Sequence, residues 1–132
     1  MPKVEISFGE VADKWTILEI KCERLVDQSQ IRNVMNEKLG LQETVDELIA
    51  VPGVQEQLEK LLATNRTIWD QMDEIYELKK TGPRYSDLTF EITVENQRRA
   101  FLKREIDRLM NSEFHEEKSY FVKPNQVVID GD

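Results

Sequence analysis

The apolar residues of this chain recur every three or four positions over most of its length, which is the spacing of helices that bury one stripe. The first of these segments begins at a cap, Ser7 or Gly9, and ends near Val26. Its stripe consists of Val11, Trp15, Leu18, Cys22 and Leu25. Ile17 and Ile20 lie on another side of the same helix, so we expect a second contact there, either within a bundle or with another subunit.

A second helix is predicted from Asp27 or Ser29 to about Ala50. Its apolar residues gather on one side: Ile31, Val34, Met35, Leu41, Val45, Leu48 and Ile49. Gly40 is a point where this helix could break, since glycine is a poor helix former. Val51-Pro52-Gly53 ends the helix, because proline cannot continue its hydrogen-bond ladder and glycine supplies a left-handed turn.

A third helix is predicted from about Val54 to Lys80, and it ends at Thr81-Gly82-Pro83. Its stripe is interrupted by the polar Asn65 and otherwise holds Val54, Leu58, Leu61, Leu62, Ile68, Trp69, Met72, Ile75 and Tyr76. We expect Trp69 and Tyr76 to belong to the core rather than to a platform for stacking a ligand.

A fourth helix is predicted from about Ser86 or Asp87 to Met110. One of its faces carries charged residues, Arg98 and Glu105, together with the apolar Val94, Phe101, Leu102, Ile106 and Leu109. Residues 88–94 are rich in strand-forming residues, so a strand there is the alternative.

Both ends of the chain have the composition of extended structure. Residues 1–8 predict an extended arm, and residues 113–132 predict an extended tail with the apolar run Val127-Val128-Ile129. We expect this run to pack along another helix or subunit. The sequence therefore predicts an all-α fold, in which a single helical domain, 1–132, forms an antiparallel bundle of about four helices with an extended C-terminal tail.

The charge balance narrows the classes of partner. The chain has 26 acidic and 18 basic residues, a formal charge of -8, which argues against nucleic acid, whose phosphates require a basic surface. One cysteine excludes an internal disulfide, and no apolar run is long enough for a membrane span or a signal peptide. We expect a cytoplasmic homo-oligomer with no membrane span, no cofactor and no bound metal.

Three polar residues stand where the helical pattern favours apolar ones: Asn65, Arg98 and Glu105. They either satisfy one another between the third and fourth helices, fixing the register, or line a polar pocket inside the bundle. We favour the first interpretation. In the second interpretation, the planar guanidinium group of an arginine can bind phosphate or carboxylate through two hydrogen bonds. The ligand-binding candidates are Asn65, Asn96, Arg98, Arg99, Lys103 and Glu105, and Asp107 lies beside them on the fourth helix.

Acidic residues recur at helical spacing, as Mg²⁺ ligands would. The groups are Glu19 with Glu23, Glu43 with Asp46 and Glu47, and Asp70 with Asp73 and Glu74. Paired acidic motifs on neighbouring helices resemble those of the all-α nucleoside triphosphate pyrophosphohydrolases. Solvated helix surfaces explain the same spacing in an acidic helical chain, and we favour that explanation over a metal site.

Four segments carry a family resemblance: residues 9–21, residues 65–75, Asn96-Gln-Arg-Arg-Ala100 with Lys103-Arg-Glu-Ile106, and Glu117-Lys-Ser-Tyr120. In this order they resemble a small uncharacterised bacterial and phage family of unknown function, found near genes for sugar transfer and surface-polysaccharide assembly. The matching motif positions are polar: Glu10, Asp13, Lys14, Glu19, Lys21, Asn96, Arg99, Lys103, Glu117, Lys118 and Tyr120. The family pattern has Asn-Asp where this chain has Asn96-Gln97, so a catalytic role for that carboxylate would be lost here.

Two functions remain open from the sequence, and whether the protein is an enzyme is not decided. We favour a non-enzymatic, oligomeric helical accessory or interaction module linked to surface-polysaccharide synthesis, because no group of residues completes a catalytic site. The alternative is a Mg²⁺-dependent nucleotide or sugar-nucleotide binding protein or pyrophosphohydrolase, which would use the arginine and lysine residues together with an acidic cluster.

Overall fold

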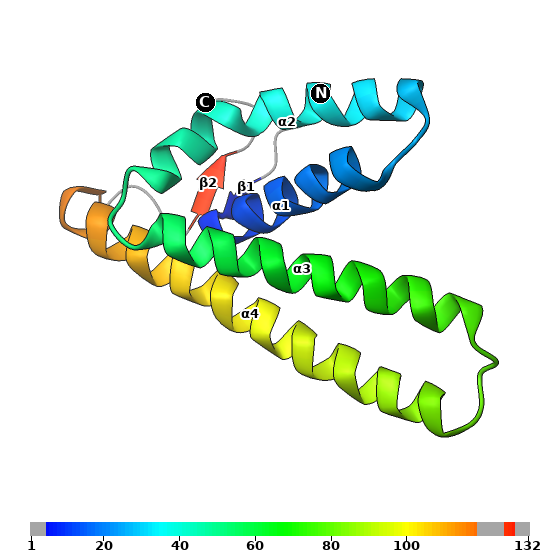
Figure 1. The fold of residues 1–132 in the computed structure, drawn as a ribbon. Helices are drawn as coiled ribbons and strands as arrows, with labels where there is room; N and C mark the ends of the chain where they lie inside the picture. Colours follow the sequence, from blue (N-terminus) through cyan, green and yellow to red (C-terminus); the bar gives the residue numbers. More distant parts are fainter. Residues whose placement is uncertain (1–4, 119–125, 129–132) are drawn as a thin grey trace.

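The structure of the protein is a computed structural model. It describes residues 5–118 and 126–128, with the side chains of residues 5–111. Its elements are β1 (Glu5–Ser7), α1 (Phe8–Arg24), α2 (Gln28–Ile49), α3 (Val54–Glu77), α4 (Pro83–Lys118) and β2 (Gln126–Val128) (Figure 1). The predicted all-α bundle with four helices is confirmed. None of the described helices combines the length and the apolarity that crossing a membrane requires.

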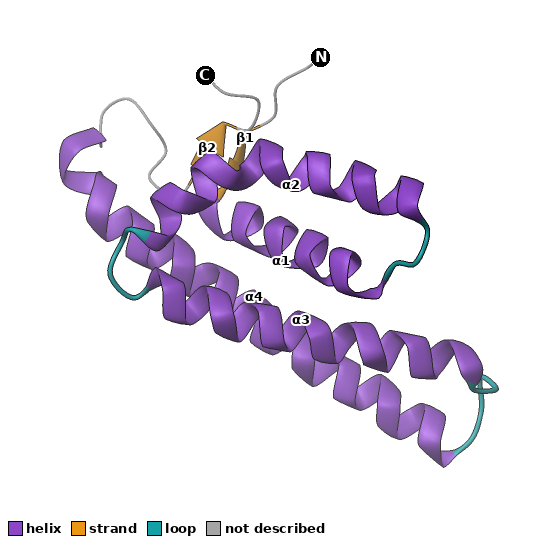
Figure 2. Cartoon of the chain, turned by 45° about the horizontal axis from the view of Figure 1, so that its top comes forward, coloured by secondary structure: helices purple, strands orange, loops and turns teal. Residues whose placement is uncertain are grey.

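The helices form two hairpins of unequal length. The shorter hairpin consists of α1 and α2, and the longer one of α3 and α4 (Figure 1). α1 is the central helix, because it packs against α2, α3 and α4, whereas α2 makes few contacts with α3. Figures 1 and 2 show that the shorter hairpin covers one end of the longer hairpin and that the other end extends beyond it.

Helix starts follow the predicted capping signals. The Ser7 hydroxyl accepts a hydrogen bond from the Glu10 N–H at 3.1 Å before α1, and the Asp27 carboxylate accepts one from the Gln30 N–H at 2.9 Å before α2. Gly53 has a φ of 91° in the turn before α3, a conformation that favours glycine. These local signals locate the first three helices to within a few residues of their predicted bounds.

Several predicted boundaries are corrected by the structure. α2 continues through Gly40 without a break, and residues 88–94 are helical rather than a strand. Leu88 is fully buried there, so packing overrides the strand preference of this run. α4 begins at Pro83, because proline fits the first turn of a helix, where its missing N–H is not needed. The helix also continues to Lys118, so residues 113–118 are not part of an extended tail.

The two ends of the chain meet in a small sheet. β1 and β2 pair antiparallel, with Ile6 opposite Val127. Within the predicted extended arm, residues 5–7 form strand β1 and Phe8 already belongs to α1. Val127 and Val128 pair with β1, and Ile129 lies outside the described residues.

The core lies where α1 crosses the other helices. It is formed by Val11, Ala12, Leu18, Val34, Leu41, Val45, Leu48, Val51, Val54, Leu58, Leu61, Leu102, Ile106 and Met110. Trp15, Cys22 and Leu25 pack against it, as their spacing predicted. Ile20 is fully buried, so the predicted second contact of α1 is made within the chain. Ile17 is only half-buried.

The apolar stripe of α3 is covered over its first half only. Val54, Leu58 and Leu61 are buried, whereas Met72 is 37% exposed and Tyr76 is 81% exposed. The prediction that Trp69 and Tyr76 belong to the core is wrong, because the shorter hairpin does not reach the far end of α3 (Figure 1). Trp69 is half-buried and lies outside the core cluster.

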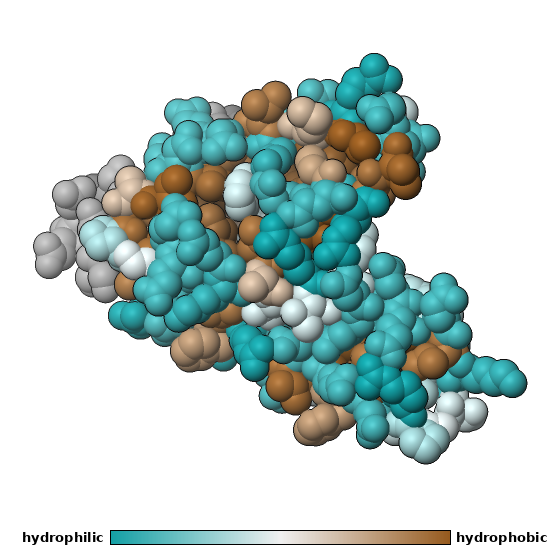
Figure 3. Space-filling model, in the orientation of Figure 1, coloured by the Kyte–Doolittle hydropathy of each residue, from teal (hydrophilic) through white to brown (hydrophobic). Residues whose placement is uncertain are grey.

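α4 has two opposite apolar faces where the sequence predicted one. Leu102 and Ile106 are buried, but Val94 and Phe101 are exposed, so they do not share a face with them. The inner face contains charged residues whose partners lie on α1, and periodicity alone could not identify it as the buried side. Figure 3 shows hydrophobic side chains along the lower edge of the molecule, over α4.

Candidate functional site

A buried polar network joins α1, α3 and α4 where the hairpins cross. The Asp13 carboxylate accepts hydrogen bonds from Asn65 Nδ2 at 2.9 Å, from Arg99 Nε at 2.8 Å and from Arg99 Nη2 at 2.6 Å. Asn65 Nδ2 also donates to Thr16 Oγ1 at 2.8 Å, and Thr16 Oγ1 donates to the Asp13 carbonyl oxygen at 2.7 Å. Asp13, Thr16 and Asn65 are buried, and Arg99 is half-buried.

Two further polar contacts continue from this network along the boundary of α1 and α4. Lys103 Nζ pairs with a Glu10 carboxylate oxygen at 2.6 Å. The Gly9 N–H donates to Asp107 Oδ1 at 2.7 Å. Arg99, Lys103 and Asp107 are four residues apart, so they form one row on α4, and each has a partner near the start of α1. We call this row and its partners the polar seam.

Burial and hydrogen bonding act in opposite directions on the carboxylates of the polar seam. Burial alone would raise the pKa of Asp13, but hydrogen bonds from Arg99 and Asn65 and the charges of Arg99 and Lys103 leave it below its ordinary value. Burial raises the pKa of Asp107 despite its hydrogen bond from Gly9. The hydrogen bond to Asp13 raises the pKa of Arg99, so Asp13 and Arg99 form an ionised pair at neutral pH.

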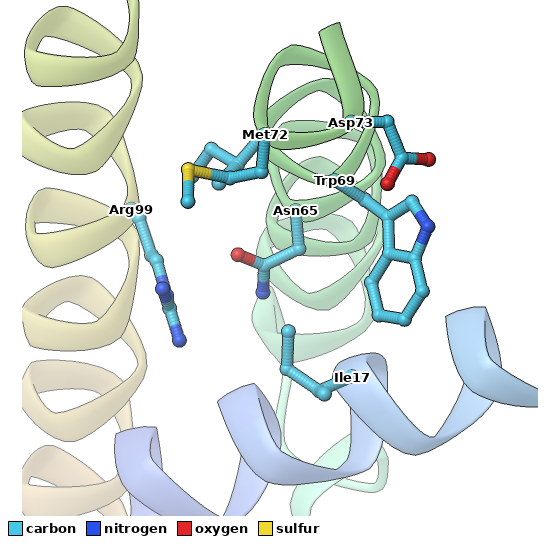
Figure 4. A pocket seen from close by; sticks show the side chains of 7 residues that line it. Ile17, Asn65, Trp69, Met72, Asp73 and Arg99 are labelled. Carbon is cyan, nitrogen blue, oxygen red and sulfur yellow. The ribbon is translucent and has the colours of Figure 1, made fainter. Parts of the chain in front are cut away.

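A pocket of about 240 Å³ opens beside the network, where α1 stops covering α3 (Figure 4). Four of its lining residues are apolar, and the remaining three are polar or charged. The lining residues are Ile17 from α1, Asn65, Ile68, Trp69, Met72 and Asp73 from α3, and Arg99 from α4. In Figure 4 the side-chain oxygen of Asn65 points towards α4 and its nitrogen towards α1.

The structure brings two of the predicted ligand-binding candidates together. Asn65 and Arg99 share the Asp13 carboxylate and both line the pocket. Lys103 lies one turn further along α4 in the polar seam, and Asn96 is exposed. The three basic candidates are each paired with a carboxylate, and Glu105 is paired with Arg108.

The predicted mutual pairing of Asn65, Arg98 and Glu105 is wrong. Arg98 Nη1 bonds the Glu95 carboxylate at 2.6 Å, and Glu105 accepts from Arg108, so both pairs stay within α4. Asn65 instead bonds residues of α1. The physical reason is the rotation of α4, which turns Arg99 rather than Arg98 towards the network.

The polar residues that match the family motif do not converge on one cavity. Glu10 and Asp13 belong to the polar seam, whereas Glu19 pairs with Lys38 of α2 at 2.5 Å. Lys14 is exposed and Lys21 is half-buried near the end of α1. Three further motif positions have side chains outside the part that the structure describes: Glu117, Lys118 and Tyr120.

Carboxylates of two of the three predicted acidic groups take part in ion pairs between helices or across a turn. The pairs are Glu19 with Lys38, Glu23 with Arg66, Asp70 with Arg24, and Glu74 with Arg84. Within residues 5–111, no three histidine, cysteine, aspartate or glutamate side chains are grouped so that they could hold a metal ion.

Thr16 is the member of the network that sequence analysis missed. It bonds both Asp13 and Asn65 and is fully buried. Its position three residues after Asp13, on the same side of one helix, was the available signal.

Comparisons with protein families, with curated proteins and with solved structures find no match to this chain. The family resemblance therefore stays a prediction, and a function has to be inferred from the geometry of the described residues.

Proposed function

We propose that this protein is a non-enzymatic helical interaction module that works as a dimer of identical chains, joined through the outer face of α4. One feature carries the proposal: an exposed row that we call the outer stripe, consisting of Asp87, Phe90, Val94, Gln97, Phe101 and Arg104. These positions alternate between steps of three and four residues, which is the spacing of a coiled-coil seam.

The outer stripe lies on the opposite side of α4 from the core. Phe90 is 69% exposed and Phe101 is 53% exposed, while Leu88, Leu102 and Ile106 on the other side are buried. Exposed apolar rows of this kind usually mark interfaces. A partner that covers this row would remove the side chains of Phe90, Val94 and Phe101 from water.

The outer stripe is complementary to itself when two copies run antiparallel. A two-fold axis passing between Glu95 and Asn96 places Phe90 against Phe101 of the second copy, and Val94 against its Gln97. The same axis places Asp87 against Arg104 of the second copy. Each contact occurs twice, as the symmetry of a dimer requires.

The charges at the ends of the outer stripe favour this pairing. Asp87 and Arg104 have no ion-pair partner among the residues that the structure describes, unlike the other arginines of α4. Antiparallel association brings these opposite charges together, whereas parallel association would place like charges side by side.

The expected interface is small. Burying an apolar side chain completely contributes about 2 kcal/mol, and association costs at least about 4 kcal/mol. We therefore expect a dimer that exchanges rapidly, with a Kd nearer the micromolar than the nanomolar range.

Support for the alternative, a Mg²⁺-dependent nucleotide or sugar-nucleotide site, is weaker. The basic residues that it needs, Arg98, Arg99 and Lys103, each have a carboxylate partner. From the family resemblance alone, we extend the proposal to an accessory role beside the proteins of surface-polysaccharide assembly.

Exchanging the end charges of the outer stripe tests the dimer. We expect Asp87→Arg or Arg104→Asp alone to weaken dimerisation about tenfold, roughly 1.4 kcal/mol, because each substitution places like charges opposite one another twice. The double variant Asp87→Arg/Arg104→Asp restores opposite charges and should return the Kd close to that of the wild type. Sedimentation velocity over a series of protein concentrations measures each Kd.

A matched control uses exposed apolar residues elsewhere. Phe90→Glu is expected to abolish dimerisation, whereas Leu39→Glu on α2, which is 70% exposed, should leave it unchanged. A wild-type chain that stays monomeric up to millimolar concentration contradicts the proposal. So does a double charge exchange that dimerises no better than the single variants.

A further inference from the structure

The pocket beside Asn65 contains a buried hydrogen-bond acceptor that the described part of the protein does not use. Asn65 is 1% exposed, and its Oδ1 atom is buried without a hydrogen-bond partner. Buried polar atoms are nearly always hydrogen-bonded, so this oxygen needs an explanation.

The orientation of the Asn65 amide follows from its partners. The Asp13 carboxylate can only accept, and Thr16 Oγ1 accepts because its own proton goes to the Asp13 carbonyl oxygen. Turning the amide over would place Oδ1 against two acceptors, so Nδ2 must face α1. Oδ1 therefore points towards α4, on the side of the pocket where Arg99 lies, as Figure 4 shows.

The walls of the pocket suit an apolar ring. Ile17, Trp69 and Met72 line it, and Trp69 offers a flat indole surface. The volume of about 240 Å³ lies below the roughly 300–1,000 Å³ of sites for drug-sized molecules. The pocket therefore has room for a ligand with one ring system rather than for an extended chain.

The charges around the pocket disfavour an anion. Arg99 uses two of its nitrogens on the Asp13 carboxylate, so its positive charge is already balanced. Asp73 also lines the pocket and is exposed, and it has no ion-pair partner among the described residues. The unbalanced charge at the pocket is thus negative, which differs from the anion site considered for Arg98, Arg99 and Lys103.

We propose that this pocket binds a small ring-bearing molecule that carries N–H donors and is neutral or positively charged. The ring lies against the indole of Trp69 and the side chain of Met72, and one N–H group donates to Asn65 Oδ1. The carboxylate of Asp73 favours a positively charged ligand over a neutral one. Because the pocket lies on the side of α4 that faces α1, away from the outer stripe, its occupation does not depend on the proposed dimer.

Three probes of the same size and different charge test this site: benzamidine, benzamide and benzoate. They are titrated into ¹⁵N-labelled protein, with the side-chain N–H signals of Asn65 and Trp69 followed by NMR. We expect affinity to fall in the order benzamidine, benzamide, benzoate, by at least threefold at each step. Trp15, the second of the two tryptophans, lies outside the pocket, so its indole signal should not move.

Two variants separate the pocket from unspecific binding. Met72 is partly exposed, and Met72→Trp would fill the pocket, so this variant should bind benzamidine at least tenfold more weakly. Met35 on α2 is 52% exposed, and Met35→Trp should leave benzamidine binding unchanged. Asp73→Asn should remove the preference for benzamidine over benzamide while leaving benzamide binding unchanged.

The results that would overturn the proposal are specific. Benzoate binding as tightly as benzamidine would reverse the charge inference. Even a low ligand efficiency of about 0.3 kcal/mol per non-hydrogen atom corresponds to a Kd of about 10 mM for probes of this size. Absence of shifts at Asn65 and Trp69 with all three probes at that concentration would therefore remove the site. Shifts that survive Met72→Trp would place the binding elsewhere on the protein.

Discussion

Arg99→Met is expected to lower the free energy of unfolding by about 3 kcal/mol at neutral pH, because it leaves the buried charge of Asp13 without its main partner. The side chain of Asp13 is 8% exposed, and two nitrogens of Arg99 bond its carboxylate. Asn65 remains as a donor, but a single neutral amide does not balance the charge. Chemical denaturation followed by circular dichroism measures the loss.

The pH dependence of this loss identifies its cause. In the wild type the pKa of Asp13 is lowered, so ionised Asp13 adds stability above its unfolded pKa of about 3.9, and this stability is lost as the pH falls through the lower folded value. Without Arg99, burial becomes the dominant influence and raises the pKa of Asp13 above its unfolded value. The variant then gains stability as its carboxyl group takes up a proton, so the difference from the wild type narrows between neutral pH and about pH 4.

Two comparisons control this experiment. Arg98→Met removes the neighbouring arginine, whose side chain is 56% exposed and paired with Glu95, and should change stability by no more than about 0.5 kcal/mol. Asp13→Asn/Arg99→Met removes both charges and should be more stable than Arg99→Met alone. Equal losses in the Arg98 and Arg99 variants would contradict the view that the network is centred on Arg99.

The positions of the first three helices could be predicted because their signals are local. Ser7 and Asp27 cap helices through N–H groups three residues away, and Gly53 supplies its turn through its own φ angle. No distant part of the chain is needed to interpret such signals. The same holds for the core stripe of α1, whose spacing alone identified Val11 and Leu18.

The orientation of α4 could not be predicted, because it depends on distant residues. Two apolar rows lie on opposite sides of this helix, and periodicity does not state which one faces the core. Asp13 and Glu10 of α1 determine which side of α4 faces the core, because they pair with Arg99 and Lys103. A row that contains paired charges can be buried, and the apolar Phe90 and Phe101 are then left outside.

Only part of the site could be predicted, because its residues come from distant parts of the chain. Asn65 was identified because a polar residue interrupts an apolar stripe, and the structure shows it buried and bonded. Its partners Asp13 and Thr16 lie 52 and 49 positions away, so no local spacing relates them. Which helix crosses α3 at Asn65 is a property of the folded chain, and sequence periodicity does not contain it.

The close contact of α1 with α4 leads to the second large effect, at Gly9. Gly9→Ala is expected to destabilise the protein by about 3 kcal/mol or more, through overpacking and a weakened hydrogen bond to a carboxylate. A Cβ atom at Gly9 would lie under 3.0 Å from the Lys103 carbonyl oxygen and 3.2 Å from Asp107 Oδ2. The Lys103 carbonyl oxygen is fixed because it belongs to the backbone of α4. The Asp107 carboxylate is fixed by the hydrogen bond that its Oδ1 accepts from the Gly9 N–H at 2.7 Å. Thermal and chemical denaturation of the variant measure the loss.

Gly40→Ala is the matched control, and it should act with the opposite sign. Gly40 lies within α2, and a Cβ atom there meets nothing within 4 Å. Alanine is the better helix former by about 1 kcal/mol, so this variant should be more stable than the wild type. Both substitutions add one methyl group to a helical glycine, so a difference in sign between them reflects the place of each glycine in its helix and the atoms that surround it. If Gly9→Ala were as well tolerated as Gly40→Ala, α1 and α4 could not approach as closely as the polar seam requires, and the partners assigned to Asp107 and Lys103 would have to be revised.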